Sequence, residues 1–154
     1  MTDLAALRRH IYELAAAFDC EVHETTEANP EDAFAIPGRR AIVIAPIREE
    51  AGYVIALHEL GHLNAPLGFL GAERRAAESA ASRHNFTLTE EQAAWEWAEH
   101  HALYWSAAMT QVRDYALGSY RDFVPPTPAP PPAPIATVHR DVATFAKQIR
   151  WGPR

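Results

Sequence analysis

The sequence predicts an α+β fold that is mostly helical, with a small sheet of two or three strands near the N-terminus. Apolar residues recur at steps of three and four over residues 3–18, which is the spacing of a helix that covers a core. β-Branched side chains then form the run Ile42, Val43 and Ile44, and residues 48–63 contain no proline. We therefore expect a helix, then short strands, then further helices.

Length and composition limit the kinds of protein that this chain can be. With 154 residues, 48% of them hydrophobic, it can bury one ordinary core, and we expect one folded domain over residues 1–123. A net charge of -6 without a basic block disfavours nucleic acid as a partner, because the phosphate backbone would be repelled. No stretch approaches the roughly 18 consecutive apolar residues of a membrane span. The single cysteine, Cys20, excludes an internal disulfide, so we expect a cytoplasmic protein.

The first elements follow from periodicity and turn residues. Residues 3–18 are expected to be helical, with an apolar stripe made of Leu4, Leu7, Ile11, Leu14 and Phe18. Residues 20–25 alternate as a strand does, and residues 33–45 are expected to hold one or two more strands. Pro37 and Gly38 lie within the second segment and favour a tight turn, which would make it a hairpin.

The middle of the chain is predicted to be helical. Residues 48–63 are expected to form one helix, and the alanine-rich residues 72–81 a partly exposed connecting helix. Thr89 is followed three residues later by a glutamine, which matches a capping box. We therefore expect a long helix to begin there and to reach about Tyr120, with a break or a continuation near Thr110.

The C-terminal part has a different composition. Residues 125–134 hold seven prolines, which fix the backbone near polyproline II and remove hydrogen-bond donors. We expect residues 124–135 to be an extended Pro-rich linker and residues 136–154 to be an amphipathic tail helix. The apolar positions of that helix are Val138, Val142, Phe145 and Ile149.

The segment His58, Glu59, Leu60, Gly61, His62 is the motif that carries chemistry. Its two histidines are four residues apart, so on a helix they lie one turn apart on the same face and can reach one metal ion. Zinc accepts imidazole nitrogen, and a catalytic zinc site combines three protein ligands with an open position for water. Glu59 is placed to take a proton from that water, so we expect it to be the general base.

A third ligand is expected from the downstream helix. Glu91 is favoured over Glu90 and Glu96, because it shares a helix face with Ala94 and Ala98, whose small side chains would let the two helices approach closely. Glu96 points about 140 degrees away, and Glu90 would lie in the first turn of the expected helix. The other candidates are His84, His100 and His101.

Three residues are candidates to donate a hydrogen bond to the negative charge that develops on a substrate carbonyl. They are His100, His101 and Tyr104. Adjacent helical residues diverge by about 100 degrees, so at most one of the two histidines can face the site.

The motif HELGH at residues 58–62 and the segment that begins at Glu91 together resemble the ImmA/IrrE family of metallopeptidases. That family combines HExxH with a later helix of the form E-x-E-A-N-x-F-A. Glu91, Ala94, Trp97 and Ala98 match its first glutamate, its alanine, its aromatic residue and its final alanine. The chain departs from that pattern at Ala93 and Trp95.

The resemblance extends over residues 4–120 and implies a zincin-like fold. It implies that His58, His62 and Glu91 bind zinc and that Glu59 is the catalytic glutamate. Many relatives act by cleaving a repressor, so it also implies a protein substrate or regulatory protein as the partner.

Two functions are consistent with these features. The first is a zinc-dependent endopeptidase that hydrolyses a peptide bond in a specific protein partner, such as a repressor. The alternative is a catalytically silent zincin-like binding or assembly protein, for example a phage or mobile-element component, that acts through its Pro-tethered tail helix. Glu59 distinguishes them, because a structural zinc site closes with a fourth protein ligand whereas a catalytic site keeps an open position and a base.

Overall fold

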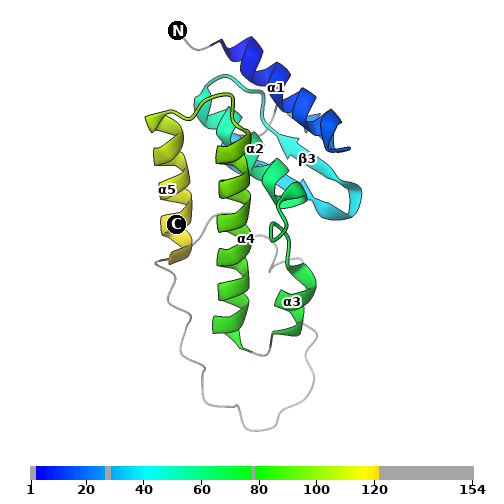
Figure 1. Ribbon diagram of the computed structural model, residues 1–154, viewed down its shortest axis with the longest axis vertical. Helices are drawn as coiled ribbons and strands as arrows, with labels where there is room; N and C mark the ends of the chain where they lie inside the picture. Colours follow the sequence, from blue (N-terminus) through cyan, green and yellow to red (C-terminus); the bar gives the residue numbers. More distant parts are fainter. Residues whose placement is uncertain (1–2, 27–28, 78, 122–154) are drawn as a thin grey trace.

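The computed structural model describes residues 3–26, 29–77 and 79–121 (Figure 1). Over these residues the fold is mixed α+β and mostly helical, as the sequence predicts. The helices are α1 (Leu4–Ala17), α2 (Glu50–Asn64), α3 (Gly71–Ala76), α4 (Ala80–His101) and α5 (Ala107–Arg121). The strands are β1 (Glu21–Glu24), β2 (Phe34–Ile36) and β3 (Ala41–Ile44), with 3₁₀ turns at Pro30–Asp32 and Pro37–Arg39. The expected domain end at residue 123, the linker at 124–135 and the tail helix at 136–154 lie outside the described residues.

The three strands form a sheet in the order β1-β3-β2. β2 and β3 are antiparallel, which confirms the predicted hairpin, and β1 joins the other edge of β3 in the parallel direction. The turn Pro37–Arg39 connects the hairpin and ends at Arg40, whose φ of 47° is left-handed. The Arg40 guanidinium donates hydrogen bonds to the carbonyls of Phe18 and Asp19, which attaches the hairpin to the end of α1.

Helix α1 forms as its periodicity predicts. The Asp3 carboxylate accepts hydrogen bonds from two N–H groups of the first turn and so caps the helix. Leu7 and Ile11 on the apolar stripe are fully buried, whereas Leu4 at its start is 36% exposed. The stripe therefore covers the core from its second turn onwards.

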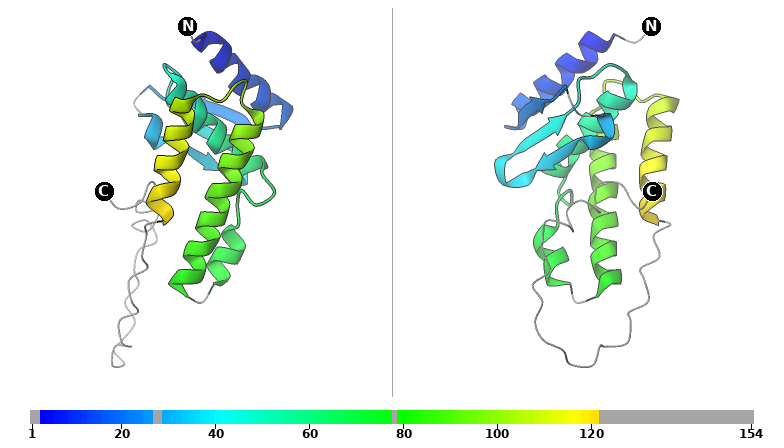
Figure 2. Two further views of the ribbon diagram at one scale, coloured as in Figure 1. Left: turned by 60° about the vertical axis from the view of Figure 1, so that its left-hand side comes forward. Right: turned by 180° about the vertical axis from the view of Figure 1, so that it is seen from behind.

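Helix α2 lies at the centre of the fold. Every residue from position 52 to position 61 is buried, so this helix has no solvent-facing side over that stretch. It packs against α1 and the sheet, and its most extensive packing is against α4. The sheet and α1 lie towards the C-terminal end of α4, and α3 lies beside its N-terminal half (Figure 2). The predicted motif therefore lies on a helix that is enclosed by the rest of the fold.

The expected start of the long helix at Thr89 is wrong. Helix α4 begins at Ala80, where the Ser79 hydroxyl accepts a hydrogen bond from the N–H of Ser82. Thr89 lies inside the helix, and its hydroxyl donates to the carbonyl of Asn85 instead of capping. The expected connecting helix over residues 72–81 is accordingly two pieces, since α3 ends at Ala76.

The expected continuation through Trp105 to a break near Thr110 is also wrong. Helix α4 ends at His101, and α5 begins at Ala107 after a turn in which the Ser106 hydroxyl accepts the N–H of Met109. The two helices run antiparallel, side by side (Figures 1 and 2). The turn therefore returns the end of α5 to the middle of α4, which a continuous helix could not do.

Helices α2 and α4 approach each other closely at Gly61. A Cβ at this position would lie 2.9 Å from the Cα of Ala94 and closer still to its carbonyl oxygen, so backbone would have to move. We expect Gly61→Ala to lower the free energy of unfolding by about 1–3 kcal/mol, as overpacking does. Urea denaturation will measure it.

Gly118→Ala is the matched control for that substitution. Gly118 also lies within a helix, but a Cβ there meets nothing within 4 Å. Alanine at this position is expected to be neutral or to stabilise by about 0.5–1 kcal/mol. Equal stability of the two variants would contradict the close helix contact at Gly61.

Candidate metal centre

Three side chains from two helices meet at one point. His58 and His62 lie one turn apart on α2, and Glu91 faces them from α4. The Nε2 of His58 lies 3.1 Å from Oε2 of Glu91, and the Nε2 of His62 lies 3.5 Å from its Oε1. Ligands of a tetrahedral zinc ion, each at about 2.0–2.2 Å, are about 3.3 Å apart. The spacing of the three side chains is therefore that of ligands around one ion.

His58 shows that this cluster fits a cation. Its side chain is 4% exposed, and its two ring nitrogens face the Glu91 and Glu59 carboxylates at 3.1 and 3.5 Å without a well-formed hydrogen bond to either. An unsatisfied buried polar group is costly. A metal ion bound between Nε2 of His58 and the Glu91 carboxylate would give that nitrogen a partner. Trp95 stacks on the His58 ring with 4.2 Å between centroids and fixes its plane.

His62 is held in the tautomer that a metal ligand needs. Its Nδ1 lies 2.8 Å from the carbonyl oxygen of Gly68, so Nδ1 carries the proton and donates it. Once Nε2 loses its proton, its lone pair faces the side of Glu91, where a metal ion would bind. A carbonyl behind a ligating histidine is a common support in metal sites, because it sets both tautomer and ring orientation.

Burial and neighbouring charges shift the pKa values of all three side chains of the cluster. Burial by itself would raise the pKa of Glu91, but His58 and His62 hold it well below its usual range. Burial by itself would lower the pKa of His62, yet the Glu91 carboxylate raises it to about 9. Burial and the charge of His62 lower the pKa of His58, but Glu59 and Glu91 raise it by more, so that it lies above its ordinary value. The carboxylate thus attracts positive charge into the site.

These charges predict how zinc affinity depends on pH. His62, with its pKa raised from 6.5 to about 9, holds a proton that a metal ion must displace. Zinc affinity should therefore rise as the pH increases from 6.5 to about 9. Isothermal titration calorimetry in buffers of different ionisation enthalpy will count the protons released. Affinity that is constant over this range would contradict the charge assigned to the pair.

Glu59 lies beside the cluster without joining it. It is 5% exposed, and its Oε1 lies 3.5 Å from Nδ1 of His58, on the ring edge away from Glu91. Its charge also acts on His62 and on Tyr120. The carboxylate is therefore close to the ligands but is not one of them, and its role as a general base stays a prediction.

The alternatives for the third ligand lie elsewhere. Glu96 is exposed, and Glu90 is buried but accepts hydrogen bonds from the Leu70 N–H and the Arg74 guanidinium. Among the described residues, the cluster that could hold a metal ion consists of His58, His62 and Glu91. The other candidates outside it are His84, His100 and His101.

The residues expected to stabilise a developing negative charge are engaged away from the ligands. Tyr104 donates to Oε1 of Glu50 at 2.7 Å, and His101 stacks on Trp97 and bonds to its carbonyl oxygen. His100 is exposed and contacts the ring of His101. His100 and His101 are the last residues of α4 and Tyr104 follows it, about three turns beyond Glu91.

Tyr120 is the residue at the site that sequence reasoning missed. It lies near the end of α5, close enough to Glu91 for that carboxylate to act on its hydroxyl. Burial, and then the charges of Glu91 and Glu59, raise the pKa of this phenol, so it remains a proton donor. Its only sequence signal was its place in a helix, because the turn that returns α5 to Glu91 was not predicted.

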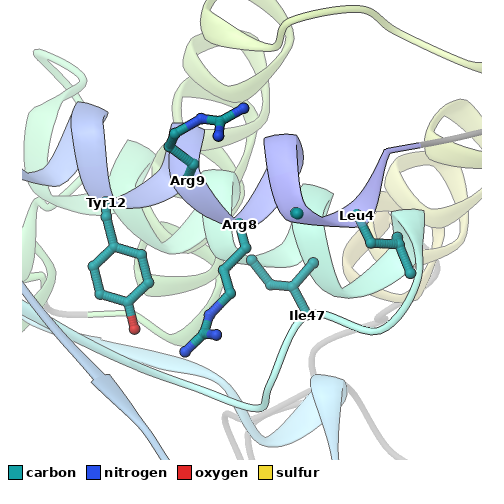
Figure 3. A pocket seen from close by; sticks show the side chains of 6 residues that line it. Leu4, Arg8, Arg9, Tyr12 and Ile47 are labelled. Atoms are coloured by element: carbon teal, nitrogen blue, oxygen red, sulfur yellow. The ribbon is translucent and has the colours of Figure 1, made fainter.

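A separate hollow of about 410 Å³ lies on α1. Leu4, Arg8 and Tyr12 of α1 line it together with Ile47, which precedes α2 (Figure 3). The Arg8 guanidinium is already paired with Glu24 at 2.9 Å. The hollow contains none of the three candidate ligands.

No helix in the described parts of the chain combines the length and the apolar character needed to cross a membrane. Comparisons with protein-family models, with curated proteins and with solved structures gave no match to this chain. The chemistry of the site is therefore inferred from its own residues.

Proposed function

We propose that this protein is a zinc-dependent endopeptidase, similar to the ImmA/IrrE metallopeptidases, that cleaves a specific protein partner. The observation that carries the proposal is the convergence of His58, His62 and Glu91 at ligand spacing, with Glu59 beside them. The donor set of two imidazoles and one carboxylate is that of catalytic zinc sites, which leave one position open. A purely structural site would favour a fourth protein ligand.

The chain's own residues divide the work of hydrolysis. When bound, zinc supplies a Lewis acid that acidifies water and polarises a carbonyl group. Glu59 accepts the proton of the attacking water on its carboxylate and returns it to the leaving amine. Trp95 and the Gly68 carbonyl hold the two imidazole rings in place. Tyr120 adds a buried phenol close to the Glu91 carboxylate.

Access to the site is expected from the side of His62. The His62 side chain is 17% exposed, whereas that of His58 is 4% exposed. A peptide would therefore approach past His62 and the residues that follow α2. A site this enclosed suits an extended or locally unfolded segment of a protein better than a folded surface.

Metal removal and restoration test the proposal. The full chain would be stripped with a chelator, reloaded with zinc, and incubated with unfolded protein substrates whose fragments are identified by mass spectrometry. We expect equimolar zinc and cleavage that disappears on chelation and returns with zinc. Failure to bind zinc would refute the metal centre, and zinc binding without cleavage would favour the catalytically silent alternative.

A further inference from the structure

Residues 65–70, here called the α2–α3 loop, connect the helix that bears both histidines to α3. The loop starts from the end of α2, where the Ala65 N–H donates to the Gly61 carbonyl at 2.8 Å. Gly68 then packs so closely on Gly61 that a Cβ at position 68 would collide with the Gly61 carbonyl oxygen. In this position the Gly68 carbonyl accepts the hydrogen bond of His62. The orientation of His62 therefore depends on where the loop lies.

Glu90 of α4 fixes the other end of that loop. Its side chain is 5% exposed, and one carboxylate oxygen accepts the N–H of Leu70. The second oxygen pairs with the Arg74 guanidinium of α3 at 2.8 Å. A buried carboxylate with two charge-assisted hydrogen bonds is a strong and directional anchor.

Glu90 and Glu91 are adjacent, and they act on the two sides of the same histidine. Glu91 contacts the Nε2 of His62, whereas Glu90 holds the loop whose carbonyl contacts its Nδ1. One turn of α4 thus supplies a ligand and also the support of a second ligand. The negative charges of Glu90 and Glu91 lie close together, and the Arg74 guanidinium places a positive charge beside Glu90.

We propose that Glu90 is a positioning residue that sets the metal affinity of the site through the α2–α3 loop and His62. This inference rests on the proposed metal centre, since it assigns to Glu90 a role in orienting one of its ligands. Partners of ligating histidines change metal affinity by about ten- to a hundredfold when removed, although they never touch the ion. Glu90 acts one step further out, through the loop that its carboxylate attaches to α4.

The test compares Glu90→Ala and Glu90→Gln with Glu99→Ala in the full chain. Glu99 lies on the same helix, about two turns beyond Glu91, where it is exposed and also pairs with an arginine, Arg113, at 2.6 Å. Zinc dissociation constants would be measured by competition with a chromophoric chelator. The visible absorption of bound Co²⁺ would report ligand geometry, and urea denaturation of the metal-free protein would report folding.

We expect Glu90→Ala to weaken zinc binding by about tenfold to a hundredfold and to alter the Co²⁺ spectrum. Glu90→Gln keeps an acceptor for the Leu70 N–H and should lose less affinity, whereas Glu99→Ala should match the wild type. A Glu90→Ala variant with unchanged zinc affinity and Co²⁺ spectrum would overturn the inference and leave the metal centre intact. Wild-type protein that binds no zinc would overturn both.

Arg74→Met is the second variant, for the case in which Glu90→Ala does not fold. The Arg74 side chain is 26% exposed, so its removal disturbs less buried structure than removal of Glu90. It should weaken zinc binding in the same direction with a smaller effect. Unchanged zinc affinity in both Arg74→Met and Glu90→Gln, each folded, would also overturn the inference.

Discussion

Glu59→Gln is expected to abolish peptide-bond cleavage while zinc stays bound. Glutamine has nearly the same shape as glutamate, so the buried position next to His58 should be retained. An amide cannot accept the proton of the attacking water, and general acid–base catalysis contributes about a hundred- to ten-thousandfold to the rate. Zinc content should not change, because the ligand cluster does not include Glu59.

Glu49→Gln is the matched control for this substitution. Glu49 occupies the N-cap position directly before α2, is exposed, and makes no side-chain capping bond. Cleavage rates and zinc content would be measured on both variants under the same conditions. Wild-type cleavage by Glu59→Gln would remove Glu59 from the mechanism, and loss of zinc from that variant would show that it acts as a ligand.

The parts of the fold that sequence reasoning predicted are those set by local patterns. The stripe that includes Leu7 and Ile11 repeats at helical spacing and is buried, so α1 could be read directly. Pro37 and Gly38 marked the hairpin turn by their own backbone preferences. The pairing of His58 and His62 needed only the geometry of one helix.

The third ligand was predicted across two helices for a different reason. Glu91 was preferred because small residues on its face would allow close approach, and Gly61 against Ala94 shows how closely the helices meet. The fold and the cluster are thereby consistent with a metal site, while the zincin-like topology and zinc itself stay predictions. Metal identity is decided by ligand chemistry and availability, which no side-chain distance contains.

The errors arose where local signals compete. Thr89 and the glutamine after it satisfy a capping pattern, but Ser79 caps the real start and Thr89 bonds within the helix. The turn after His101 depends on distant groups, because the Leu103 N–H donates to the hydroxyl of Tyr53 on α2. The periodicity of one segment does not reveal contacts between residues far apart in the sequence, so the return of Tyr120 to the site could not be predicted.

Glu91→Ala is expected to lower zinc affinity by more than about a hundredfold, the upper end of the loss seen for partners that only support a ligand. It removes the one carboxylate that both imidazoles face, and with it the charge that raises the pKa of His62. Chelator competition and zinc analysis after dialysis will measure the change.

Glu96→Ala is the matched control, because it removes a carboxylate from α4 at a position that does not face the two histidines. Glu96 lies five residues further along α4, where its side chain is exposed, and its removal should leave zinc affinity unchanged. If Glu96→Ala lost zinc while Glu91→Ala kept it, the third ligand would be reassigned. Such a reversal would require α4 to turn by more than a third of a revolution, which the close packing of Ala94 on Gly61 does not allow.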